Sequence, residues 1–235
     1  MDAKANAFRI SGNSLIKQNL RQSNQLSLPP KWYTSQDYTI PTIGSMSLRR
    51  LSFLPALLLA ASLAASAATP GVGQSAPDFT LPTPGGNSLT LSSLTSQGNV
   101  VLIVLRGYPG YQCPFSQQQF QLYQQAAAQF AALGAQVLFV YPGTDSKNLM
   151  SDALQMTGLA PLPANIHIVL DPTYQVVNQY GLRWNGPSET AYPSTFVVSK
   201  GGTIYFAHTG YSFSDQTPPS DTLAVINANT GATKP

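Results

Sequence analysis

Three largely apolar runs limit the folds that this chain can adopt. They are NVVLIVLRG (99–107), AQVLFVYPG (135–143) and IHIVLD (166–171). A strand with one face in water alternates apolar and polar residues, whereas a continuous run rich in Val, Ile and Leu is typical of a strand buried on both faces. Because such strands need covering layers above and below the sheet, the runs favour an α/β fold.

Helical patterns separate these runs. The segment after Cys113 and Pro114 repeats apolar residues at spacings of three and four, which marks one buried helical face, and Gly134 is placed to cap its end. We expect further helices at 146–157, 173–180 and 220–227, short strands at 78–81 and 88–91, and two strands joined by a hairpin turn at Gly201-Gly202. This order of elements predicts a three-layer α/β sandwich.

The distribution of charge argues against a nucleic-acid partner. The formal net charge of +3 comes from the first 67 residues, which hold seven Lys or Arg and two Asp. The other residues hold five Lys or Arg and seven Asp or Glu. Nucleic-acid binding needs a clustered basic face, so we expect none in the folded part.

Residues 46–67 have the pattern of a secretory signal peptide. MSLRR supplies a positive start, LSFLPALLLAASLAA an apolar stretch, and Ala65-Ser66-Ala67 a small-residue cleavage site. The stretch ends in small residues and falls short of the roughly 20 apolar residues of a spanning helix. We therefore expect cleavage after Ala67 or Ala68, no membrane attachment afterwards, and a mature domain at 69–235 that is exported, periplasmic or secreted.

Residues 1–45 precede this pattern and are rich in Asn, Gln and Ser without apolar periodicity. That composition is typical of a disordered extension. A signal peptide belongs at a terminus, so we hypothesise that translation starts at Met46 and that residues 1–45 are a mis-assigned start.

Cys113 is the single cysteine of the chain. One cysteine excludes an internal disulfide and a zinc site built on paired cysteines, and two histidines argue against a histidine-rich metal cluster. We expect neither a metal nor a cofactor.

The position of Cys113 favours a reactive thiol. It lies between a buried strand and a long helix, directly before Pro114, which suits the first helical turn. The free N–H groups and positive dipole end of a helix stabilise a thiolate. Arg106, Tyr108 and Tyr111 are close in sequence and can supply a cation and hydroxyl groups. The competing interpretation is a small buried cysteine that behaves as a hydrophobe, a common state for free cysteines.

Several segments occur in the order expected of the alkyl hydroperoxide reductase and thiol-specific antioxidant family. They are APDFTLPTPGG, VVLIVLRG followed by CP, DPTYQVVNQYGL and PSTFVVSKGGTIYFAH. Over roughly residues 73–227 the chain resembles this family, the peroxiredoxins and their thioredoxin-fold relatives. The resemblance implies a thioredoxin-like three-layer sandwich with a central mixed sheet and an N-terminal extension. It also implies a peroxidatic or redox-active cysteine at Cys113.

Two positions before Cys113 depart from the family. Peroxiredoxins carry a proline seven residues before the peroxidatic cysteine and a threonine three residues before it, and this chain has Arg106 and Gly110 there. The threonine of the family holds the peroxide by hydrogen bonding, and glycine has no side chain with which to do so.

Two later positions also depart. Pro193 stands where the family has its catalytic arginine. A proline there resembles thioredoxins and their relatives, in which it is cis and faces the reactive cysteine. Arg106 and Arg183 are candidates for the missing guanidinium. Ser116 occupies the place of the second cysteine of a CxxC pair, so a dithiol mechanism within one chain is excluded.

The function expected from these features is that of an exported single-cysteine peroxiredoxin-like thiol oxidoreductase. Cys113 would reduce peroxides, with Arg106, Tyr108 and Pro193 in support. Because the chain has no resolving cysteine, an external thiol reductant, or Cys113 of a second copy in a homodimer, must complete the cycle. The alternative is a non-peroxidatic thioredoxin-fold binding module or a monothiol disulfide-exchange protein.

Overall fold

The computed structural model describes residues 67–143, 147–158 and 161–231. The expected extension at 1–45 and nearly all of the expected signal peptide, 46–66, lie outside these ranges, so both stay predictions. Within these ranges, no helix is both long enough and apolar enough to cross a membrane.

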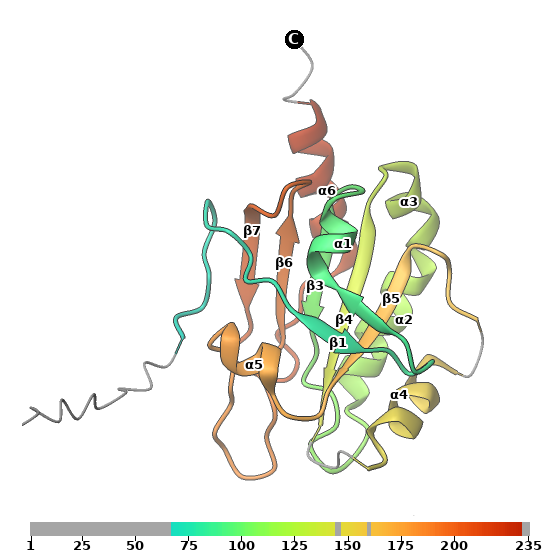
Figure 1. Ribbon diagram of the computed structural model, residues 1–235, viewed down its shortest axis with the longest axis vertical. Helices are drawn as coiled ribbons and strands as arrows, with labels where there is room; N and C mark the ends of the chain where they lie inside the picture. The colour runs from blue at the N-terminus through green and yellow to red at the C-terminus, as the bar shows by residue number, and fades with distance from the viewer. Residues whose placement is uncertain (1–66, 144–146, 159–160, 232–235) are drawn as a thin grey trace, which may run out of the picture. The chain divides into compact units, whose positions relative to one another are not determined.

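A five-stranded mixed sheet forms the centre of the domain (Figure 1). Its strand order is β5-β4-β3-β6-β7. The strands are β3 (Val100–Val104), β4 (Gln136–Pro142), β5 (Ile166–Asp171), β6 (Ser194–Val198) and β7 (Ile204–Thr209). The three apolar runs supply β3, β4 and β5, which are parallel to one another, whereas β6 and β7 are antiparallel.

Helices cover one face of this sheet. They are α2 (Pro114–Gln125), α3 (Ala127–Ala132), α4 (Leu149–Thr157) and α6 (Pro219–Gly231). Phe120, Phe130, Met156 and Ile226 from these helices share one core cluster with Val101 and Ile103 of β3. The apolar spacing noted after Pro114 therefore packs the helices against the sheet.

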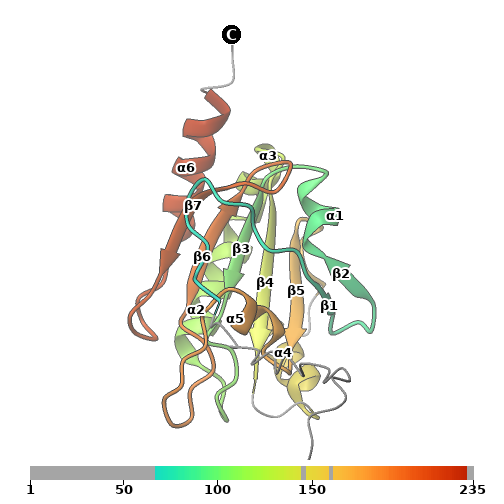
Figure 2. The ribbon, with the colours of Figure 1, turned by 60° about the vertical axis from the view of Figure 1, so that its left-hand side comes forward.

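Two short helices and a hairpin cover the other face (Figure 2). They are α1 (Leu91–Thr95), α5 (Gln175–Gln179) and the antiparallel strands β1 (Thr80–Pro82) and β2 (Ser88–Thr90). Their core cluster includes Val100, Leu102 and Val104, the residues of β3 that alternate with those facing the other helices. Both faces of β3 are thus buried, and the predicted three-layer α/β sandwich is confirmed.

The helix expected through residue 133 is interrupted. Ala126 has φ −87° and ψ 0°, and it separates α2 from α3. The spacing of apolar residues did not reveal the break, because Tyr123 and Phe130 on either side pack into the same core with stacked rings. Gly134 follows α3 with a φ of +60°, a left-handed conformation that suits glycine at the end of a helix.

The carboxyl ends of the parallel strands β3, β4 and β5 meet at one edge of the sheet. The chain leaves β3 there and passes through residues 105–113 into α2. In α/β sheets this edge is where functional loops gather.

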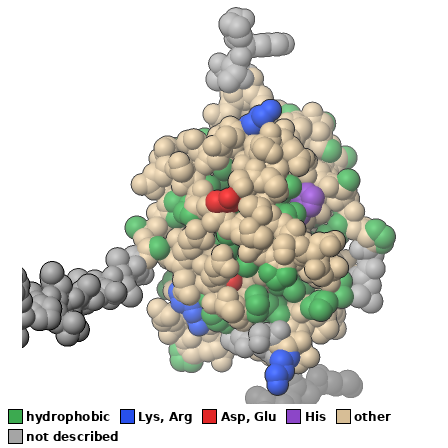
Figure 3. Space-filling view, in the orientation of Figure 1, with side chains coloured by type: hydrophobic (Ala, Val, Ile, Leu, Met, Phe, Trp, Pro, Cys, Tyr) green, Lys and Arg blue, Asp and Glu red, His purple; other side chains and the backbone are tan. Residues whose placement is uncertain are grey.

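On the face seen in Figure 3, the basic side chains are isolated rather than clustered.

Candidate active site

Cys113 is the N-cap residue of α2, and Pro114 is its first helical residue. The side chain is buried, with Cys113 only 1% exposed. Its sulfur accepts no capping hydrogen bond from the helix backbone. The predicted position at the helix start is therefore found, but the direct polar partner of the thiol lies elsewhere.

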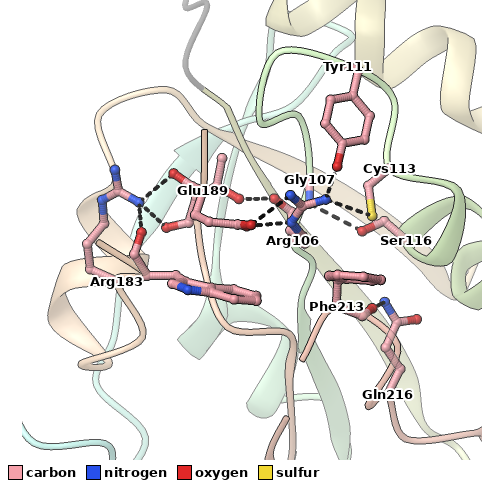
Figure 4. A network of polar contacts seen from close by, with 11 residues as sticks. Arg106, Gly107, Tyr111, Cys113, Ser116, Arg183, Glu189, Phe213 and Gln216 are labelled. Carbon is pink, nitrogen blue, oxygen red and sulfur yellow. Dashed lines mark hydrogen bonds and ion pairs between the residues drawn. The ribbon is translucent and has the colours of Figure 1, made fainter. Parts of the chain in front are cut away.

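That partner is Arg106, which follows the end of β3. Its Nη1 lies 3.7 Å from Cys113 Sγ and donates a hydrogen bond to it (Figure 4). The same Nη1 donates a 2.6 Å hydrogen bond to the hydroxyl of Tyr111. A guanidinium in contact with a sulfur favours the thiolate, which is the nucleophilic form of cysteine.

Glu189 holds the guanidinium from its other side. Arg106 Nε donates to Glu189 Oε2 at 2.6 Å, and Nη2 donates to Oε1 at 3.0 Å. The side chains are 5% and 16% exposed. Burial alone would lower the pKa of Arg106, but its hydrogen bonds to Glu189, Tyr111 and Cys113 outweigh burial and raise that pKa. Arg106 is therefore a permanent cation beside the thiol.

Arg183 fixes the loop that carries Glu189. Its Nη1 donates to the backbone carbonyls of Trp184 and Glu189, each at 2.8 Å, and also to that of Thr190. The Thr190 hydroxyl in turn donates to the carbonyl of Arg106. Of the two arginines considered from sequence, Arg106 contacts the thiol, whereas Arg183 stabilises the supporting loop.

The structure places the two nearby tyrosines differently. Tyr111 supplies the hydroxyl that meets Arg106. Tyr108 instead packs against the apolar core, and its backbone N–H donates to the carbonyl of Pro142 at 2.8 Å. Among the described contacts, Tyr108 makes no hydrogen bond to Arg106 or Cys113, so none supports the role expected of it. Tyr111 is the tyrosine that contacts Arg106.

Pro193 is buried directly before β6. Because Val104 of β3 pairs with Ser194 of β6, Pro193 lies beside the end of β3 from which Arg106 extends. No peptide bond among the described residues is cis, so the cis proline implied by the likeness to thioredoxins is wrong here.

Aromatic rings surround the guanidinium. Arg106 Cζ lies 5.3 Å from the ring centroid of Tyr111 and 5.5 Å from that of Phe213. Phe213 also contacts Phe115, with 5.3 Å between the ring centroids. These rings limit the access of water to Arg106, which strengthens its electrostatic effect on the thiol.

Ser116 and the backbone complete the site. The Ser116 hydroxyl is buried and accepts a 3.3 Å hydrogen bond from the N–H of Gly107, which ties the loop after β3 to α2. Across the three described ranges, no group of three or more His, Cys, Asp or Glu side chains is arranged to hold a metal ion. The described contacts of the site bring together one thiol, one guanidinium and the Tyr111 hydroxyl.

Glu189 and Phe213 belong to the site but were not predictable from the sequence. Glu189 is 83 residues from Arg106 along the chain, and neither residue lies in a motif that links the two. Only the packing of the 183–191 segment against the end of β3 brings this carboxylate to the site.

Comparison with protein families gives one match that spans most of the described domain. A family model described as the AhpC/TSA family matches residues 72–207. No curated protein sequence matches the chain.

Solved structures share the fold. Peroxidoxin BcpB from Mycobacterium tuberculosis has 22% identity and a TM-score of 0.53, over 67% of this chain and 96% of that one. The reduced 2-Cys peroxiredoxin of Plasmodium vivax has 16% identity and a TM-score of 0.55, over 68% and 82%. The mitochondrial 2-Cys peroxiredoxin of Plasmodium falciparum has 15% identity and a TM-score of 0.54, over 68% and 95%. The predicted thioredoxin-like fold is thereby confirmed.

Proposed function

The chain belongs to the AhpC/TSA family, and from this premise we propose that it is an exported single-cysteine thiol peroxidase. Cys113 is the peroxidatic residue, and an external thiol is the reductant. The observation that carries the proposal is the 3.7 Å hydrogen bond from Arg106 Nη1 to Cys113 Sγ. It places a fixed positive charge beside the only thiol of the chain, and thiolate is the form that attacks peroxides.

The first step oxidises the sulfur. The Cys113 thiolate attacks one oxygen of a hydroperoxide, an S–O bond forms and the O–O bond breaks. Sulfur loses two electrons and becomes a sulfenic acid, while the second oxygen leaves as hydroxide or alkoxide and takes up a proton. Arg106 stabilises the thiolate before the attack and the negative charge on oxygen during it.

The second step needs a thiol from outside the chain. An external thiol attacks the sulfenic sulfur, which releases water and leaves a mixed disulfide, and another thiol then frees Cys113. Cys113 of a second copy in a homodimer is the other available thiol, because the chain has no second cysteine. The fold shared with peroxiredoxins supports peroxide as the substrate.

The experiment for this proposal compares the wild-type protein with Cys113→Ser. The wild-type protein should consume hydrogen peroxide in the presence of excess external thiol, and the variant should not. Full activity in the variant would refute the assignment of Cys113.

Export is part of the proposal, and the pattern at 46–67 supports it. N-terminal sequencing of the protein from its native source should find Ala68 or Thr69 first. A peptide from residues 1–45 in the natural precursor would contradict the hypothesis that translation starts at Met46.

A second candidate is a monothiol disulfide-exchange protein or a binding module. The burial of Cys113 favours it, as does Gly110, which offers no side chain to a peroxide. This candidate predicts that Cys113 forms no sulfenic acid with peroxide and reacts slowly with iodoacetamide at neutral pH.

A further inference from the structure

Tyr111 and Cys113 share one nitrogen of Arg106. Nη1 donates to the Tyr111 hydroxyl at 2.6 Å and to Cys113 Sγ at 3.7 Å (Figure 4). Both groups therefore lie on the same side of the guanidinium, away from Glu189. An oxygen that approaches the sulfur from this side comes next to the Tyr111 hydroxyl.

The hydrogen-bond inventory of Arg106 shows which donors remain. A guanidinium has five N–H groups. Two of them bind Glu189, and the Nη1 pair binds Tyr111 and Cys113, which leaves a single N–H on Nη2. Arg106 thus has little donor capacity left for a peroxide that needs one hydrogen bond at each oxygen.

Tyr111 can supply the additional donor. Its oxygen accepts from Arg106, so its own proton points elsewhere, and no acceptor for that proton is found among the described contacts. The side chain is 49% exposed, which leaves room for a small molecule beside the hydroxyl. Contact with a guanidinium also polarises the O–H bond and makes the phenol a better donor.

We propose, on the basis of the proposed function, that Tyr111 is a catalytic residue of the peroxidase reaction. Its hydroxyl donates a hydrogen bond to the oxygen that leaves when Cys113 attacks the peroxide. As the O–O bond breaks, negative charge gathers on this oxygen, and it takes a proton from solvent after the S–O bond has formed. Arg106 then stabilises the thiolate and acts on the leaving oxygen through its positive charge, while Tyr111 donates a hydrogen bond to that oxygen.

The residue before Tyr111 has open space beside it. Gly110 has a φ of +106°, a conformation that side chains rarely adopt, and no atom lies within 4 Å of the place where its Cβ would stand. Tyr111, which carries the hydroxyl, therefore directly follows a glycine that has open space beside it.

The test substitutes Tyr111→Phe, which removes the hydroxyl and keeps the ring that contacts Arg106. Tyr211→Phe is the matched control, because Tyr211 is 90% exposed. Two rates are measured in the full-length protein: sulfenic-acid formation with hydrogen peroxide and alkylation by iodoacetamide. The alkylation depends on the thiolate but involves no leaving oxygen.

We expect Tyr111→Phe to slow sulfenic-acid formation by about 10- to 100-fold, the effect of losing one hydrogen bond to a developing charge. Alkylation should stay within about twofold of the wild-type rate, and the control should match the wild-type protein in both reactions. An unchanged or faster peroxide reaction in Tyr111→Phe would overturn the role of Tyr111 but leave the proposed function intact. An equal loss in both reactions would also overturn it, since a merely structural role gives that result. If the wild-type protein itself forms no sulfenic acid, the proposed function fails and this inference fails with it.

Discussion

Glu189 binds Arg106 through both carboxylate oxygens, at 2.6 and 3.0 Å, although the two residues are 83 positions apart in the sequence. This pairing fixes the plane of the guanidinium. It also leaves Nη1 directed at Cys113 and Tyr111. Glu189 is thus a positioning residue that acts on the thiol through Arg106.

Removing the charge of Glu189 should destabilise the fold. Glu189→Gln leaves the buried Arg106 without its anionic partner, so we expect the free energy of unfolding to fall by about 2–3 kcal/mol in denaturant titration. Asp221→Asn, which removes an exposed carboxylate from the first turn of α6, should cost less than about 1 kcal/mol. An equal fall in the free energy of unfolding in the two variants would show that the Glu189–Arg106 ion pair stabilises the fold no more than an exposed carboxylate does.

The two arginines should differ in their effect on chemistry. Lysine has no planar fork, so Arg106→Lys cannot hold Glu189 in two places and also reach the sulfur. We expect it to slow sulfenic-acid formation about 100-fold. Arg183→Lys should slow it much less, because Arg183 donates to backbone carbonyls of the loop. A larger loss in Arg183→Lys would mean that the wrong guanidinium has been assigned to the thiol.

The elements of the fold were largely predictable from the sequence, because both faces of β3 are buried and leave an uninterrupted apolar run. The junction of Cys113 and Pro114 similarly marked the start of α2. Those signals are local. The break at Ala126 was not predictable, since helices on both sides of it bury the same face and keep the same spacing.

The partners of the thiol were only partly predictable. Arg106, Tyr108 and Tyr111 all stood near Cys113 in the sequence, but which hydroxyl meets the guanidinium depends on the turns of the backbone between them. Glu189 gave no signal, because its pairing arises from tertiary packing alone. The trans bond before Pro193 likewise differs from what the likeness to thioredoxins implied.

The loop between Arg106 and Cys113 depends on Gly107. Its φ is +67°, and a Cβ there would stand 2.1 Å from the carbonyl oxygen of Pro142. Gly107→Ala should therefore cost more than about 4 kcal/mol in the free energy of unfolding, or prevent folding. Gly134→Ala is the control: its φ is +60° but its Cβ would meet nothing within 4 Å, so the cost should be about 1–2 kcal/mol. Similar melting temperatures for the two variants would contradict the close approach at Gly107.

Stability should fall at mildly acidic pH through His167. Burial lowers its pKa below the ordinary value of 6.5. The unfolded chain then binds the proton more readily than the folded protein, so the free energy of unfolding decreases as the pH falls below about 6.5. His167→Gln replaces the imidazole with an amide that does not titrate and can still donate to Gln136, so it should weaken this decrease between pH 7 and pH 5. Identical pH profiles for the variant and the wild-type protein would rule out this contribution.

The assignment of Cys113 as the peroxidatic residue is tested most directly by intact mass spectrometry. The wild-type protein is treated with sub-stoichiometric hydrogen peroxide in the presence of a sulfenic-acid trap, and its mass is then measured. Cys113→Ser serves as the control, because Cys113 is the single cysteine. We expect a rapidly formed adduct on Cys113 in the wild-type protein and none in the variant. A wild-type thiol that stays unmodified would contradict peroxidase chemistry at Cys113 and favour disulfide exchange or binding.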